Sequence, residues 1–254
     1  MSATLTAELR KLRATRTTTA AGLVVAGLSA AIAAANVLLA GRDDNPALDA
    51  GTFHHVVRAP TAIVGFAMLV VGVLASAGEY RHNTIVPSLL AQPNRARFAA
   101  AKLQAVATLG LVIAAVSAVV SSAVGMALLS SREAPAADLG PVPSGLLVLG
   151  GTAALYGVLG VGLGLLLRNQ AVAMTVSLVW YFVVEQIAPM VLGAPHAQKW
   201  LPGGAADAFT RLGDPAGRSA AGLVAPWLGG GLLTAYALGL AALATAALVH
   251  RDQT

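Results

Sequence analysis

The chain of 254 residues is too apolar for a soluble globular domain. Hydrophobic residues make up 57% of it and charged residues 11%, whereas a soluble domain carries roughly 25% charged residues. The mean hydropathy of +0.74 and the net charge of +5 therefore indicate a basic protein embedded in a membrane.

Residues 1–18 precede the first apolar segment and have an amphipathic, basic pattern. Leu5, Leu9 and Leu12 recur at helical spacing among basic residues, which favours a helix lying in the cytoplasmic interface of the membrane. A frayed basic tail that only orients the chain is the alternative. A cleaved signal peptide is disfavoured, because its apolar core is only about 7 to 15 residues long and the apolar run here is longer.

Residues 19–249 contain six continuous apolar stretches, which predict an all-α, polytopic membrane protein. Each stretch is close to or above the roughly 20 residues that a helix needs to cross the hydrocarbon core of a bilayer. The six predicted transmembrane helices span residues 19–40, 59–77, 103–130, 145–167, 171–192 and 224–249.

The distribution of Lys and Arg predicts that both termini are cytoplasmic. With that orientation, ten of the sixteen Lys and Arg residues lie in cytoplasmic segments, including the tail of residues 250–254. The isoelectric point near 10.1 then reflects topology and contact with anionic lipid, so no nucleic-acid partner is expected.

The cytoplasmic loop of residues 79–102 carries a short apolar helix. Asn83 or Thr84 is suited to cap its start, and Pro93 marks its end. An apolar ridge two turns long is costly in water unless it docks into a protein groove or lies on lipid. The ridge consists of the i,i+4 pairs Ile85 with Leu89 and Val86 with Leu90.

Two further features lie within the spans. Gly160 and Gly164 form a small-xxx-small pair in the fourth span, which favours close helix packing over a dinucleotide-binding loop. Glu185 is the acidic residue of the fifth span, in its outer half. It lines a path for a cation or a cationic drug, or it is a protonated or hydrogen-bonded carboxyl that pairs with Gln186 or a neighbouring helix.

The sequence lacks the usual constellations of an enzyme. It contains no cysteine, and His54 and His55 with Asp49 make a poor metal site, so no metal is expected. The GxxxxGK[ST] phosphate loop is also missing, so the chain cannot bind ATP in the P-loop manner. Any ATP-driven step would require a partner.

The order of these features resembles the membrane (permease) subunit of a type-2 ATP-binding-cassette (ABC) exporter. The resemblance covers the basic N-terminus with Glu8 and Lys11, the six spans, and the P-x-R-x-R-x4-K pattern of the first cytoplasmic loop. In that family this loop forms a coupling helix that seats in a cleft of a separate ATPase subunit. The family often has Gly where this chain has Asn83, and Asn also tolerates left-handed backbone. The resemblance assigns ATPase coupling to Glu79, Thr84, Ile85, Leu89, Pro93, Arg95, Arg97 and Lys102.

The resemblance implies a function in efflux across the bacterial cell (plasma) membrane. The permease would pair with a second copy or a homologue and with two copies of a cytoplasmic P-loop ATPase, which binds the ATP and Mg. It also implies short helices in the outer loop of residues 193–223 that dip into the outer leaflet, although an amphipathic surface loop explains the same residues. A non-transporting anchor or immunity protein and an ion-coupled secondary transporter are the alternatives.

Overall fold

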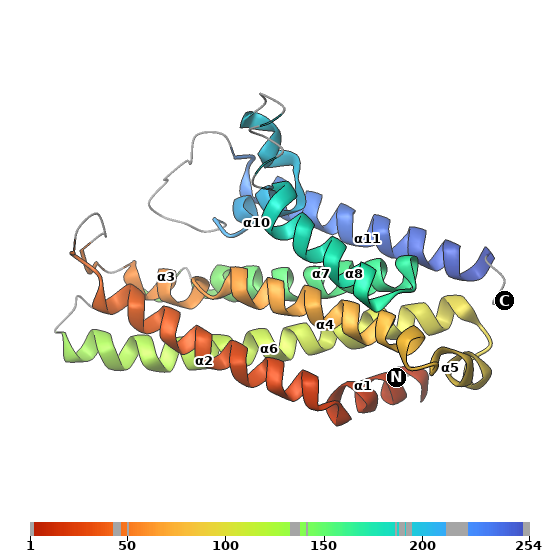
Figure 1. The fold of residues 1–254 in the computed structure, drawn as a ribbon. Helices are drawn as coiled ribbons and strands as arrows, with labels where there is room; N and C mark the ends of the chain where they lie inside the picture. Colours follow the sequence, from red (N-terminus) through yellow and green to blue (C-terminus); the bar gives the residue numbers. More distant parts are fainter. Residues whose placement is uncertain are drawn as a thin grey trace.

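The computed structural model describes residues 3–42, 47–49, 51–132, 138–140, 142–185, 187, 191, 195–211 and 223–250. Within these residues every regular element is a helix, so the predicted all-α class is confirmed. The long helices run alongside one another, and α1 lies at the same end of the bundle as the last turn of α11 (Figure 1).

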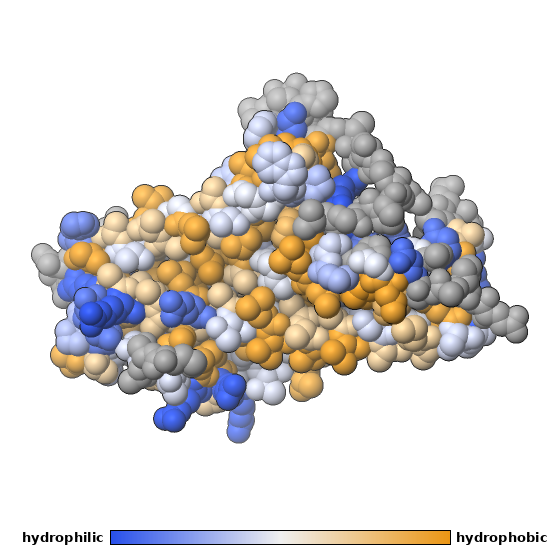
Figure 2. Space-filling model, turned by 180° about the vertical axis from the view of Figure 1, so that it is seen from behind, coloured by the Kyte–Doolittle hydropathy of each residue, from blue (hydrophilic) through white to orange (hydrophobic). Residues whose placement is uncertain are grey.

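Five helical segments are long and apolar enough to cross a membrane, which supports a membrane protein. Hydrophobic side chains cover much of the bundle's flank, and hydrophilic ones gather toward the end that carries α1 (Figure 2). Apolar side chains such as Leu23 and Val24 are exposed, as expected for a surface in contact with lipid. The five segments are α2 (Arg16–Leu38), α3 (Thr52–Arg58) with α4 (Thr61–Arg81), α6 (Arg95–Ser131), α7 (Val142–Leu167) and α11 (Pro226–His250).

The segment predicted as the fifth span differs from the others. It begins as α8 (Gln170–Val179), with 10 residues, and continues as a π-helical turn, η1 (Trp180–Val184), with 5 residues. Together they form a shorter apolar helix. Most of residues 186–194 lie outside the described residues. The sixth membrane crossing therefore stays a prediction.

The second membrane segment begins earlier than the sequence indicates. His54 and Arg58, which were expected in an outer loop, lie in α3 and are buried. Nε2 of His54 lies 2.6 Å from Nη1 of Arg58. His54 thus gives the buried guanidinium of Arg58 a hydrogen-bonding partner, which a charge buried away from water needs. Pro60 then separates α3 from α4.

The outer region contains two short helices, η2 (Pro195–Trp200) and α10 (Pro202–Phe209). The short helices that the resemblance implies for residues 193–223 correspond to η2 and α10, and residues 212–222 lie outside the described part of the chain. Ala205 and Ala206 are buried against Leu233 and Ala237 of α11. The described part of this region is thus packed onto the bundle.

Among the described helices, α4 and α7 share the most extensive contact, and Gly160 and Gly164 lie in it. A Cβ atom at Gly160 would overlap the carbonyl oxygen of Leu69 and come within 3.0 Å of the Cα of Gly72. At Gly164 it would overlap the hydroxyl of Ser76. At both positions the absence of a side chain is therefore what allows α4 and α7 to pack this closely.

We expect Gly160→Ala to destabilise the protein by about 1–3 kcal/mol, because the added methyl group meets backbone that cannot move aside. The thermal unfolding midpoint of the detergent-solubilised protein should fall. Gly231→Ala in α11 is the control, since its Cβ would meet no atom within 4 Å. Its midpoint should stay the same or rise, and an equal fall in both variants would contradict the packing role.

Candidate coupling surface at the cytoplasmic loop

The chain leaves α4 through a turn that is centred on Asn83. The backbone N–H of Thr84 donates to the carbonyl oxygen of Glu79 at 2.9 Å, and that of Asn83 donates to Tyr80 at 3.3 Å. Asn83 has φ of 55°, in the left-handed region. These bonds form a Schellman motif, which needs a left-handed residue at this position. Asn83 therefore makes the turn that was expected of it in place of Gly.

The next helix, α5 (Ile85–Ala91), has one face on the protein and one in the open. The side chain of Ile85 is buried and that of Leu89 packs on the same core. By contrast, Val86 is 56% exposed and Leu90 is 77% exposed. The two pairs of the predicted ridge therefore differ: Ile85 and Leu89 pack on the core, and Val86 and Leu90 are exposed. Val86 and Leu90 are the more exposed pair, and the coupling role that the resemblance assigns to Ile85 and Leu89 stays a prediction.

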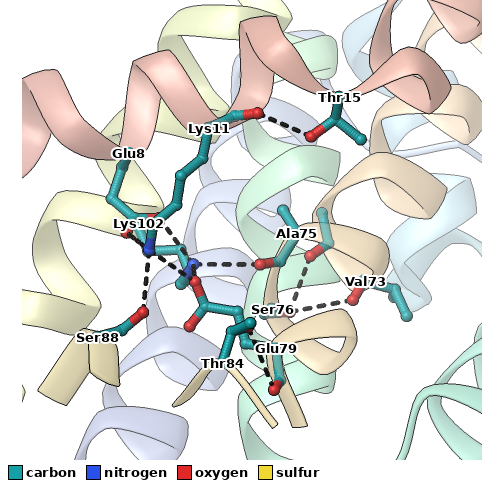
Figure 3. Close-up of polar contacts among 11 residues, drawn as sticks. Glu8, Lys11, Thr15, Val73, Ala75, Ser76, Glu79, Thr84, Ser88 and Lys102 are labelled. Atoms are coloured by element: carbon teal, nitrogen blue, oxygen red, sulfur yellow. Dashed lines mark hydrogen bonds and ion pairs between the residues drawn. The ribbon is translucent and has the colours of Figure 1, made fainter. Parts of the chain in front are cut away.

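Four charged side chains meet behind α5, and we call them the four-charge cluster: Glu8, Lys11, Glu79 and Lys102 (Figure 3). The Nζ atom of Lys102 lies 2.7 Å from Oε2 of Glu8 and 3.0 Å from Oε1 of Glu79. The Nζ atom of Lys11 lies 2.6 Å from Oε1 of Glu8 and 2.9 Å from Oε1 of Glu79. Each acid therefore binds both lysines, and the cluster is neutral as a whole.

Each ammonium group of the cluster has three acceptors. Lys102 also donates to the carbonyl oxygen of Ala75 at 3.1 Å, and Lys11 donates to the hydroxyl of Ser88 at 3.1 Å (Figure 3). An ammonium has three protons to donate, so both lysines are satisfied. This matters most for Lys102, because its side chain is only 2% exposed and an unpaired charge there would be very costly.

The cluster joins four helices into one unit. Glu8 and Lys11 come from α1 (Ala3–Ala14), Glu79 from the end of α4, and Lys102 from the start of α6. Ser88 adds α5 through its bond to Lys11. A second bond, from the side-chain amide of Gln92 to the hydroxyl of Thr4 at 2.9 Å, also ties the exit of α5 to α1. The position of α5 therefore depends on α1.

The other cations of the loop have different positions. The guanidinium of Arg95 donates to the carbonyl oxygens of Leu248 at 3.0 Å and Val249 at 3.3 Å, so it caps the end of α11. Arg97 and Pro93 are exposed. Asn94 caps α6 by accepting from the backbone N–H of Arg97 at 2.9 Å. The structure thus separates Arg95, which holds the fold, from Arg97, which faces solvent.

The electrostatic environment keeps Glu8 and Lys11 charged. Burial raises the pKa of Glu8, but the attraction and hydrogen bonds of Lys102 and Lys11 outweigh it, so the pKa falls below its ordinary 4.5. Burial lowers the pKa of Lys11, but its hydrogen bonds to Glu8 and Glu79 prevail, so its pKa rises above 10.5. Both groups are therefore ionised at neutral pH.

Lys102→Met should destabilise the protein by about 3–5 kcal/mol, because it leaves two buried carboxylates with one cation. Unfolding of the purified protein in detergent measures the loss. Arg97→Met, at an exposed position, is the control and should leave stability nearly unchanged. The double variant Lys102→Met with Glu8→Gln should recover part of the loss, since it removes one charge of each sign. Additive losses would show that the two residues do not interact.

The docking of α1 should persist over a wide pH range and fail in acid. Because the folded pKa of Glu8 lies below its unfolded value, its contribution is complete above about pH 4.5 and is lost as pH falls through the folded pKa. The raised pKa of Lys11 makes its contribution complete below about pH 10.5 and lost only above that value.

Paired spin labels can measure this docking, since the chain has no cysteine. Labels at Arg10→Cys and Ala96→Cys report the distance from α1 to α6. In nanodiscs the distance distribution should stay narrow from neutral pH down to about pH 4.5 and broaden only as the pH falls through the lowered pKa of Glu8. Glu8→Gln should already broaden it at pH 7. An unchanged distribution in Glu8→Gln at pH 7 would refute the role of Glu8.

Glu185 forms a second buried polar site, on the opposite side of the fold. Its Oε1 accepts from the indole N–H of Trp180 at 2.9 Å, and Gly203 donates its backbone N–H to Oε1 at 2.8 Å and to Oε2 at 2.7 Å. The carboxyl thus joins η1 to the start of α10. Its partners are a ring and a backbone group, and the side chain of Gln186 lies outside the described residues.

The described residues contain no group of three or more His, Asp or Glu side chains that could hold a metal. No protein-family model and no curated protein sequence matches this chain. The sequence contained part of the signal for the four-charge cluster, since Glu8 and Lys11 are three residues apart on one predicted helix and both appear in the resemblance.

Proposed function

We propose that this protein is the membrane subunit of an ATP-driven ABC exporter and that α5 is its coupling helix. The observation that carries the proposal is a short helix between two membrane helices that exposes Val86 and Leu90, while Lys11 of the four-charge cluster binds its Ser88. This helix lies at the end of the bundle that carries α1 and the last turn of α11 (Figure 1).

The exposed pair fits a protein groove. Val86 and Leu90 are four residues apart and therefore stand one above the other on the outer face of α5. An apolar ridge of this kind is the usual anchor of a helix that lies in a groove. The exposed cations Arg81 and Arg97 flank the helix. They would suit a groove with an acidic rim.

The attachment of α5 favours transmission of force over a flexible tether. Ser88 and Gln92 bind α1, and Lys11 of α1 binds Glu79 at the end of α4. A push on α5 would therefore reach α4 without an intervening loose loop. The tight contact of α4 with α7 at Gly160 would carry the same displacement into the centre of the bundle.

In the proposed assembly, two permease chains bind two copies of a cytoplasmic P-loop ATPase. The ATPase binds ATP and Mg, and its closure would push α5 and drive export by alternating access. The membrane would be the plasma membrane of a bacterium. Arg outnumbers Lys by thirteen to three, a balance typical of GC-rich bacterial genomes.

Leu90→Asp and Val86→Asp should detach the ATPase, because each places a charge in the groove that the apolar side chain would fill. The tagged protein is purified from its native host in mild detergent, and co-purifying proteins are identified by mass spectrometry alongside an ATPase assay. We expect a P-loop ATPase at near equal stoichiometry with the parent protein. Its recovery should fall roughly tenfold or more with either variant, as for a lost interface anchor.

Ala96→Asp is the matched control, since it adds the same charge at an exposed position nearby and should leave the complex intact. Leu89→Asp is less informative, because Leu89 packs on the core and its loss would disturb the fold. If no ATPase is recovered even after cross-linking in intact membranes, the proposal fails. An anchor protein or a secondary transporter would then be the better explanation.

A further inference from the structure

A cavity of about 450 Å³ lies on the flank of the bundle, between α7, η1 and α11. This volume is typical of small-molecule sites, which span roughly 300–1,000 Å³. Leucine side chains and three aromatic rings, those of Tyr156, Trp180 and Tyr181, line its inner wall, and Tyr236 lines the side of α11. Trp180 is 42% exposed and Tyr236 is 40% exposed, so the cavity opens on the lipid-facing flank.

The cavity contains one ionisable acid, Glu185. Its side chain is buried, and both of its hydrogen-bond partners, Trp180 and Gly203, are neutral donors. Among the described residues no Lys, Arg or His forms an ion pair with it. An ionised carboxylate in such a place lacks a countercharge, and buried charges are normally paired. A cation bound in the cavity would supply that countercharge.

The aromatic rings suit a cation that is itself apolar. The hydroxyl of Tyr236 donates to the carbonyl oxygen of Trp200 at 2.7 Å, and that of Tyr181 donates to Ala62 at 3.3 Å. The indole N–H of Trp180 is bound to Glu185. With their polar atoms engaged, these side chains offer ring surface, which attracts organic cations through cation–π contact.

A smaller polar cavity of about 100 Å³ adjoins the first, and Tyr156, Tyr181 and Glu185 line both. It adds a second acid, Asp207, and the hydroxyl of Thr152. Thr152 is 2% exposed, and its Oγ1 has no hydrogen-bond partner among the described residues. A buried polar atom of this kind indicates water or a ligand in the cavity. The apolar cavity thus adjoins a polar cavity, with Glu185 at the border of both and Asp207 in the polar one.

We propose that this cavity binds a lipophilic monovalent cation that enters from the bilayer, with Glu185 as its countercharge. That this cation is the exported substrate rests on the function proposed above. Binding of the cation is independent of that function, because every residue that lines the cavity belongs to this chain. A probe of the class is tetraphenylphosphonium, and tetraphenylborate has the same shape with the opposite charge.

Binding of labelled tetraphenylphosphonium to the purified protein, without ATPase or nucleotide, tests the inference. Saturable binding is expected, and labelled tetraphenylborate, measured in a separate sample, should not bind. Gly239→Leu should abolish it, because Gly239 lines the cavity and has open space around its Cα, so a larger side chain fills the site without a clash. Gly231→Leu, on the same helix and outside the cavity, should bind as the parent does.

Glu185→Gln should weaken binding roughly tenfold or more, as loss of one member of a desolvated charge pair does. Its amide oxygen can still accept from Gly203, so α10 should stay in place. Equal binding of both probes, or unchanged binding by Gly239→Leu, would overturn the inference. Binding that holds in a protein from which no ATPase is recovered would leave this site intact and reject only the exporter proposal.

Discussion

The architecture of the candidate coupling surface depends on the burial of one charge, that of Lys102. Removing an ammonium group from water costs several kcal/mol unless close partners replace the solvent. No single helix supplies them. The acceptors come from Glu8 on α1, Glu79 on α4 and the backbone of Ala75. The buried lysine therefore holds α1 against the membrane helices, where a basic amphipathic segment would otherwise lie on lipid.

The position of α5 follows from the same constraint. Once α1 is held, Lys11 and Thr4 stand beside α5 and bind Ser88 and Gln92. Ile85 then faces the core, and Val86 and Leu90 face outward. The hydrogen bonds of Ser88 and Gln92 to α1 give the helix a fixed orientation, with Val86 and Leu90 on its exposed face. Such pre-organisation lowers the entropy that docking costs.

Sequence reasoning succeeded where a local rule decides the outcome. Five of the six predicted spans are long apolar helices in the described part of the chain, and Asn83 has the left-handed backbone that lets it stand in place of Gly. It failed where distant contacts decide. Glu8 and Lys102 are 94 residues apart, so no spacing reveals their bond. Periodicity defined a ridge on α5 but did not show which of its two pairs is exposed. Hydropathy did not show that Arg58 would be buried in a helix beside His54.

The two buried acidic sites differ in a way that bears on what each does. In the four-charge cluster two acids face two lysines, and both ammonium groups have their full set of acceptors. The charges of this cluster therefore balance within the chain, which suits a structural role. Glu185 accepts only neutral donors and borders two cavities. Its charge can be balanced only from outside the described residues, which is the condition for a binding site.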